Sequence, residues 1–187
     1  MRRPVLVSAT VAPIALIGGW TVAASRQPAA YDATRDTISA LAAHGAADRW
    51  VMTAGLALLG GCHIVTALGL EEARPLGRVL LGLGGVSSVL VAVFATPSAV
   101  HFPVATTSFI ALAAWPAAAG LPNRTSGWLA TGGLAAALVW LAVELDDGAL
   151  LGVSERVVAG AEALWPLVAV LATRAASGRV GRAARGH

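Results

Sequence analysis

Glu162 combines a reactive side chain with an unusual position in this sequence. It lies inside a long apolar run, and Glu155 occupies the same helical face seven residues earlier, where the run begins. A charged group at mid-membrane depth costs roughly 2.5 kcal/mol or more, so Glu162 should face the protein interior or water and have a partner. A neutral carboxyl there could transfer a proton, and one held charged by Arg156 could orient a substrate. A buried hydrogen bond that holds the helix in place is the equally open structural alternative.

His101 and Ser39 offer further side chains for catalysis. His101 lies in the segment "TPSAVHFP", residues 96–103, where two prolines stiffen the backbone. It could bind a metal, act as a general base or anchor the lid through a hydrogen bond, and the anchor is the commoner role of a single histidine. A Ser39–His101 pair would supply a nucleophile and a base. A metal site needs three converging ligands, and His101 is the only strong candidate, so we expect no metal.

His63 and Cys62 lie about 20 Å along a helix that begins at Trp50. That depth places His63 far from His101 and from the acidic residues, including Glu162, whereas a haem held by two histidines needs imidazoles that face one another. We therefore expect His63 to be a polar packing group. The sequence also contains no Walker loop and no dinucleotide fingerprint, so it predicts no cofactor.

The segment "YDATRDTISALAAHG", residues 31–45, predicts a short helix between two apolar runs. Asp36 suits the N-cap position, residues 37–44 supply about two turns, and Gly45 can adopt the left-handed conformation that ends a helix. The apolar residues at positions 38, 41 and 42 then share one face. We expect an ordered lid. Capping alone is the simplest role of Asp36, and also of Asp48, which would cap the following helix.

The composition predicts a protein dissolved in lipid. Of the 187 residues, 57% are hydrophobic and only 12% charged, and the mean hydropathy is +0.73. A soluble domain carries about a quarter charged residues. Six apolar runs approach the roughly 20 residues that cross a bilayer: residues 5–24, 50–70, 79–96, 104–121, 127–143 and 155–173. The expected fold is all-α, a polytopic bundle of six transmembrane helices with a short extracytoplasmic lid helix between the first and the second.

The arginines predict the orientation of this bundle. All 13 basic residues are arginines near the ends of apolar runs, which is typical of membrane orientation and argues against nucleic-acid binding. With both termini in the cytoplasm, nine arginines lie inside and four lie outside, namely Arg26, Arg35, Arg49 and Arg156. We therefore expect a multi-pass inner-membrane protein with cytoplasmic termini. Residues 1–174 would form the membrane domain and residues 175–187 a disordered basic tail.

Local patterns predict packing and one further cap. Small residues four positions apart let helices approach closely, and three such pairs occur: Gly84 with Ser88, Gly132 with Ala136, and Gly133 with Ala137. Ser154 is a plausible N-cap of the sixth membrane helix.

Three stretches resemble one known family. "YDATRDTISALAAHG" with the following "RWVMTAGLALLGG", His101 after a glycine-rich third helix, and "GVSERVVAGAEALWP" resemble bacterial membrane proteins grouped as domain of unknown function 998. The likeness covers residues 19–171. The chain is more distantly similar to the eukaryotic Frag1/DRAM/Sfk1 family, whose members have six membrane helices and are linked to lipid and membrane homeostasis. The resemblance implies a topology rather than a reaction, and it matches Ile38, Ser39, Gly45, His101, Glu162 and Trp165.

These residues predict a polar pocket under the lid at the outer end of the bundle, lined by Asp36, Ser39, His101, Arg156 and Glu162. Three functions stay open: binding or handling of outer-leaflet lipid, proton-coupled transport through Glu162, and hydrolysis at the outer face. A carrier needs polar groups that continue to the inner face, and only residues 62, 63 and 66 extend that way. Of the three functions, lipid handling requires the fewest specialised residues. We therefore favour a non-enzymatic role with membrane lipid as the partner.

Overall fold

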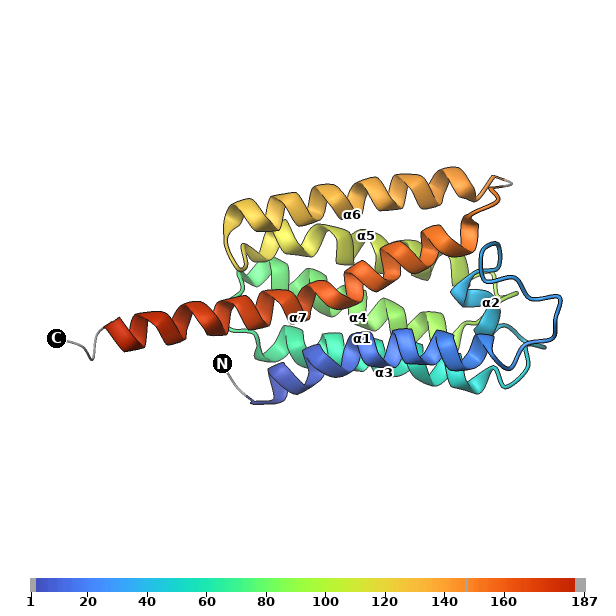
Figure 1. Cartoon of the computed structure of the whole chain (residues 1–187), viewed down its shortest axis with the longest axis horizontal. Coiled ribbons are helices and arrows are strands. Elements are labelled where there is room, and N and C mark those ends of the chain that lie inside the picture. The colour runs from blue at the N-terminus through green and yellow to red at the C-terminus, as the bar shows by residue number, and fades with distance from the viewer. Residues whose placement is uncertain (1–2, 147, 184–187) are drawn as a thin grey trace.

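The computed structural model describes residues 3–146 and 148–183, which form seven helices and no strand (Figure 1). The helices are α1 (Arg3–Ala24), α2 (Ile38–Ala42), α3 (Trp50–Gly69), α4 (Pro75–Val93), α5 (His101–Ala119), α6 (Arg124–Glu144) and α7 (Leu151–Ala183). All except the five-residue α2 are long and apolar enough to cross a membrane. The predicted six spans and the short helix between the first two are confirmed.

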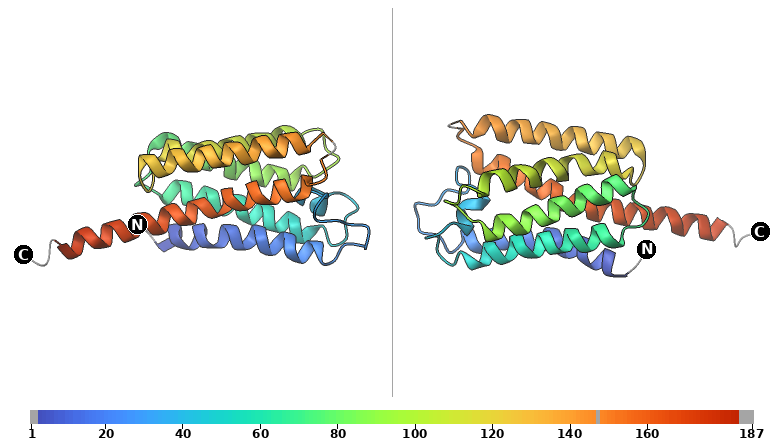
Figure 2. Two further views of the ribbon diagram at one scale, coloured as in Figure 1. Left: turned by 45° about the horizontal axis from the view of Figure 1, so that its top comes forward. Right: turned by 180° about the vertical axis from the view of Figure 1, so that it is seen from behind.

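The six long helices form one bundle in which chain neighbours lie side by side (Figure 2). α1, α3, α4 and α5 pack closely in that order, and α7 closes the bundle against α1. α6 packs on α5 and α7 at the outside, and only Gly127, Leu134 and Leu141 are buried on it. The helix α2 covers one end of the bundle, which we call the lid end. The N-terminus and the last turns of α7 lie at the opposite, terminal end (Figure 1).

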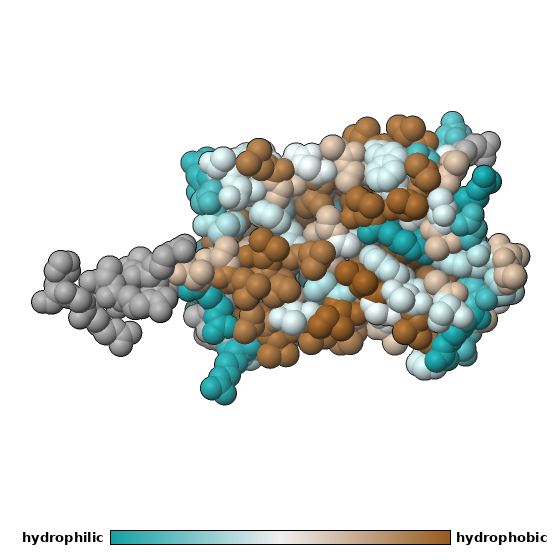
Figure 3. Space-filling model, viewed as in Figure 1, coloured by the Kyte–Doolittle hydropathy of each residue, from teal (hydrophilic) through white to brown (hydrophobic). Residues whose placement is uncertain are grey.

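The surface has the pattern of a lipid-facing protein. Apolar residues cover the middle of the bundle and hydrophilic residues gather at its two ends (Figure 3). Large apolar side chains such as Val7, Ile14, Leu68 and Leu129 are exposed. Exposed apolar surface of this extent is stable in hydrocarbon, where every backbone polar group is satisfied within a helix.

Glycines allow the central helices to approach closely. A Cβ atom added at Gly85 of α4 would lie 2.7 Å from the carbonyl oxygen of Gly60 on α3. Gly84 faces Leu112 of α5, which agrees with its predicted packing role. The prediction for Gly132 and Gly133 is wrong, because neither has an atom within 4 Å of such a Cβ. Both lie on α6, whose exposed faces have no helix to approach.

The ends of the lid helix differ from the prediction by a few residues. α2 covers Ile38–Ala42 instead of residues 37–44, and its N-cap is Thr37, whose hydroxyl accepts the N–H of Ala40 at 3.0 Å. Asp36 is therefore not the cap. Gly45 has a φ of +102° and continues the turn after the helix. Asp48 does not cap α3 either: the N-cap is Arg49, which makes no side-chain capping bond.

α7 is longer than predicted at both ends. It begins at Leu151, so Ser154 lies inside the helix, where its hydroxyl donates to the carbonyl of Leu151. The residues after 174, expected to be disordered, continue as helix to Ala183, beyond the end of the bundle (Figure 1). The rest of that expected tail, residues 184–187, lies outside the described residues.

Candidate functional site

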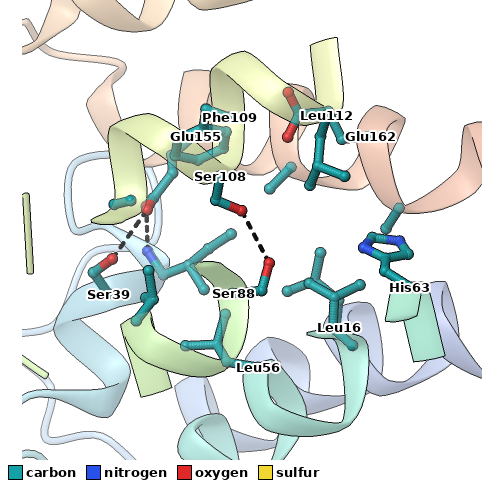
Figure 4. Close-up of a pocket in the computed structure, with 16 residues that line it drawn as sticks. Leu16, Ser39, Leu56, His63, Ser88, Ser108, Phe109, Leu112, Glu155 and Glu162 are labelled. Atoms are coloured by element: carbon teal, nitrogen blue, oxygen red, sulfur yellow. Dashed lines mark hydrogen bonds between the residues drawn. The ribbon is translucent and has the colours of Figure 1, made fainter. Parts of the chain in front are cut away.

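The lid helix is attached to α7 through Glu155. One carboxylate oxygen of Glu155 accepts the backbone N–H of Ile38, and the other accepts the hydroxyl of Ser39 at 3.3 Å (Figure 4). Ile38 is the first residue of α2, where backbone N–H groups have no partner within the helix. The apolar face of α2 packs against α1, α3 and α7, so that Ile38, Leu41 and Ala42 are buried. Glu155 itself is only 7% exposed.

Arg156, the next residue of α7, forms hydrogen bonds with the loop that leads into the lid. Its Nη1 donates to the carbonyl oxygens of Ala33 and Asp36, each at 2.9 Å, and of Gly152 at 2.8 Å. Its Nη2 donates to the hydroxyl of Tyr31. Burial raises the pKa of Tyr31 above its ordinary value of 10.0, against the opposing effect of Arg156. Arg156 thus acts on the lid backbone, and its guanidinium is occupied there.

A cavity of about 430 Å³ lies under the lid, between α5, α6 and α7. We call it the lid-end cavity. Its volume is in the range of small-molecule sites. Its polar lining includes Ser39, His101 and Glu155. The larger part of the wall is apolar and includes Phe102, Phe109, Ile110, Leu138, Leu141 and Leu151.

His101 is fixed at the rim of this cavity by the end of the preceding helix. It is the first residue of α5, and its Nδ1 lies 2.9 Å from the carbonyl oxygen of Phe94, the C-cap of α4. A carbonyl can only accept, so Nδ1 carries the proton. The carbonyl of Phe94 belongs to the last, unpaired turn of its helix, so the bond satisfies a backbone group that α4 leaves free. His101 was predicted to anchor the lid, whereas this bond joins the start of α5 to the end of α4.

A second, inner cavity of about 50 Å³ lies deeper in the bundle (Figure 4). Its polar lining comes from five helices and includes Ser88, Ser108, His63 and Glu162. The hydroxyls of Ser88 and Ser108 lie 2.9 Å apart, and both donate to the carbonyl oxygen of Gly84. The inner cavity adjoins the lid-end cavity, because Ser39, Ala105, Phe109 and Glu155 line both.

His63 and Glu162 are buried in this inner cavity with unused polar atoms. His63 is 0% exposed and Glu162 1%. Both ring nitrogens of His63 and the Oε1 of Glu162 lack a hydrogen-bond partner among the described residues. Buried polar groups are nearly always hydrogen-bonded, and the space beside these atoms is large enough for water. The inner cavity can therefore hold water beside these side chains.

The predicted site residues are divided among three places. Ser39 and His101 share the lid-end cavity, and Ser39 also lines the inner cavity with Glu162. Asp36 and Arg156 line neither cavity: the carboxylate of Asp36 accepts the N–H of Asp32 at 2.7 Å. The hydroxyl of Ser39 donates to Glu155, so the nucleophile and base pair of Ser39 and His101 is not formed. No group of three His, Cys, Asp or Glu side chains that could hold a metal occurs in the described part of the chain.

Sequence reasoning missed the roles of Glu155, Tyr31 and His63. The expected separation of His63 from the acids is wrong with respect to Glu162, since both line the inner cavity. Depth along the helices could have revealed this. α7 starts at Leu151, so Glu162 lies about 17 Å from its beginning, close to the 20 Å of His63 along α3. The partners of Glu155 and Tyr31 lie more than 100 residues away, and no local pattern indicates them.

The fold and the surface define a multi-pass helical membrane protein with a lid over one end of its bundle. The chain belongs to the family described as "Protein of unknown function (DUF998)", whose model matches residues 10–172. No curated protein and no solved structure matches the chain. The more distant likeness to the Frag1/DRAM/Sfk1 proteins stays a prediction.

Proposed function

We propose that this protein binds lipid from the outer leaflet of the inner membrane in its lid-end cavity. The observation that carries the proposal is the composition of the cavity wall, which is apolar over most of its area and polar where Ser39, His101 and Glu155 meet the lid. An amphiphile has the same division, with an apolar chain and a polar head. Sites for small molecules are commonly apolar with a few polar groups that fix orientation.

The position of the cavity suits a ligand that arrives from the bilayer. α6 forms one wall through Leu138, Leu141 and Leu145, and this helix is largely exposed to lipid. Figure 3 shows a hydrophilic patch on the side of the bundle between the apolar surfaces of α6 and α7. If the acyl chain of a lipid entered between the helices, the polar groups of the cavity would need to accommodate only the lipid head.

The distribution of arginines supports an outward-facing lid. Arg26, Arg35, Arg49 and Arg156 lie in lid-end loops and first turns, while the terminal end carries Arg3, Arg74, Arg78, Arg124 and Arg174 among the described residues. Arginine is enriched in cytoplasmic segments. The lid would then face outside, with both termini in the cytoplasm.

Lipid binding can be tested by native mass spectrometry of the protein released from nanodiscs made of its host membrane lipids. We expect retained lipid in the wild type and its loss in Ala142→Trp, because residue 142 lines the cavity. Val139→Trp is the matched control, since Val139 is 65% exposed on the same helix. A wild type that retains no lipid, or an Ala142→Trp variant that retains as much as the wild type, would refute the proposal.

A second candidate function, proton-coupled transport, is favoured by one observation. Glu162 and His63 are buried in one cavity with unpaired polar atoms, and ionisable groups at this depth mark proton pathways in transporters. The test is acidification of proteoliposomes that contain a trapped pH-sensitive dye. Proton flux that Glu162→Gln abolishes, in protein of unchanged thermal stability and with no retained lipid, would favour the carrier over the lipid-binding protein.

A further inference from the structure

The lid-end cavity presents two strong hydrogen-bond acceptors beside the neutral hydroxyls of Thr37, Thr96 and Thr106, which can donate or accept. These two acceptors indicate which head group the cavity takes; the inference rests on the proposed lipid binding. His101 is the first acceptor. Its Nδ1 donates to the carbonyl of Phe94, so in the neutral imidazole Nε2 has a lone pair and no proton. The ring lines the cavity and is 7% exposed.

Glu155 is the second acceptor. Its two oxygens accept from the N–H of Ile38 and from the hydroxyl of Ser39, and the backbone N–H of Ser39 also bonds to the carboxyl group. An ionised carboxylate has about four lone-pair positions, so acceptor capacity remains after these bonds. Ser39 has used its hydrogen on Glu155 and can only accept a further bond.

No cationic side chain balances this acceptor set. The residues that line the cavity include neither Lys nor Arg. Arg156 is adjacent to Glu155 in sequence, but its guanidinium donates to lid carbonyls and to Tyr31. The charge of Arg156 acts on Glu155 from outside the cavity, so an anionic head would meet the carboxylate with no cationic side chain in the wall to bind it, and like charges at close range in a low dielectric repel.

We propose that the lid-end cavity selects amphiphiles whose head donates hydrogen bonds and carries no negative charge, as a hydroxyl or a primary ammonium group does. The head sits between His101 and Glu155, and the chain lies along the apolar walls from α5 and α6. A carboxylate head of the same chain length is excluded.

The test compares three probes that differ only in their heads: hexadecanol, hexadecylamine and hexadecanoate. Each pair is mixed in equal amounts into phosphatidylcholine nanodiscs that hold the full chain at neutral pH, and native mass spectrometry gives the ratio of retained probes. We expect the alcohol and the amine each to exceed the acid by about tenfold or more, equivalent to about 1.4 kcal/mol. The ratio of amine to alcohol separates the contribution of positive charge from that of hydrogen bonding.

Glu155→Gln should bring the ratio of amine to acid close to one, while Glu144→Gln should leave it unchanged. Glu144 lies at the same end of the bundle but bonds to Trp140 and Leu150 outside the cavity. Because Glu155→Gln also loosens the lid, the total amount of retained probe is compared with that of the wild type, and a loss of selectivity at unchanged total retention is the expected result. Equal retention of the acid by the wild type overturns the selectivity and leaves lipid binding intact. If neither the probes nor native lipid is retained, both proposals fail.

Discussion

Glu155 of α7 and Ile38 of α2 are joined by a hydrogen bond between residues 117 positions apart in the sequence. The bond provides the short lid helix with an acceptor for its first N–H group, while Thr37 supplies another for Ala40. A five-residue helix is marginal in isolation. The lid is therefore held in shape by α7 as much as by its own residues.

Glu155→Gln should loosen the lid. The bonds from Ile38 and Ser39 go to different oxygens of Glu155, and in the amide one of these oxygens becomes an NH2 group that cannot accept. One bond in its present geometry is therefore lost, and a buried hydrogen bond of this kind is worth about 1–3 kcal/mol. Hydrogen exchange of residues 38–42 should become faster in nanodiscs. Glu144→Gln, at the same end of the bundle, should leave this exchange unchanged. Equal acceleration in the two variants would contradict the role of Glu155.

Arg156→Lys should release the chain that leads into the lid. A single ammonium cannot reproduce the planar fork that donates to Ala33, Asp36 and Tyr31. Faster hydrogen exchange over residues 31–37 is the expected result. Tyr31→Phe removes only one of these bonds and should have a smaller effect. The prediction is wrong if the lysine variant exchanges no faster than the phenylalanine variant.

His63→Leu should keep or raise the unfolding temperature in detergent. Neither ring nitrogen has a partner in the described structure, and replacing an unsatisfied buried polar group by an apolar one of similar size is often neutral or stabilising. Thr66→Val, one turn along α3, is the matched control. It removes a buried bond of 2.8 Å to Ser8 and should cost about 1 kcal/mol. A larger loss from His63→Leu would show that His63 has a partner such as bound water.

Gly60→Ala should destabilise the bundle, whereas Gly61→Ala should not. A Cβ at Gly60 would lie 2.7 Å from the Cγ2 and 2.9 Å from the backbone nitrogen of Val89 on α4. Overpacking of this kind costs about 1–3 kcal/mol. At Gly61 no atom lies within 4 Å of the added Cβ, and alanine gains helix propensity. Thermal unfolding of the two variants in the same detergent distinguishes a tight α3–α4 contact from a general intolerance of substitution.

The Arg26–Asp48 pair predicts a pH dependence at the lid end. Arg26 donates to Asp48 at 2.9 Å and lowers the pKa of Asp48 below its ordinary value of 3.8. A lowered native pKa stabilises the fold above the unfolded-state pKa, and the gain is lost as the pH falls through the native pKa. The unfolding temperature of Asp48→Asn should therefore lie below that of the wild type at pH 5–7. The difference should shrink below pH 3.8, and a constant difference would contradict the assignment.

Much of the fold follows from the sequence because lipid imposes a minimum apolar length on every spanning helix. The six long helices and the lid were predicted for this reason. The cap positions were not predicted correctly, because Asp36 and Thr37 are adjacent and both are good N-cap residues. The four extra residues at the start of α7 had the largest effect on the predicted site. A helix that begins at Glu155 places Glu162 only about two turns from its start, so the sequence did not indicate that Glu162 lies at a similar depth to His63.

The candidate site was predictable only where it depends on local sequence. A hydrogen-bonded role for His101 follows from a single histidine between two prolines, but its partner is Phe94 at the end of α4, seven residues away, and not the lid as predicted. The lid contacts of Glu155 and Arg156 depend on how α7 packs against a loop more than 100 residues away. Arg156 was expected in the pocket because its charge suited a head group. Four backbone and side-chain acceptors in the structure occupy it instead.

α7 is long enough to reach from one face of the membrane to the other. Its 33 residues extend about 50 Å, well beyond the roughly 30 Å of hydrocarbon. Its first turns form hydrogen bonds with the lid. Its last turns project past the bundle at the other end (Figure 1). Because one continuous helix joins the lid to the opposite surface, a displacement of its first turns would also displace its last turns, together with α1 and α6, which pack against it.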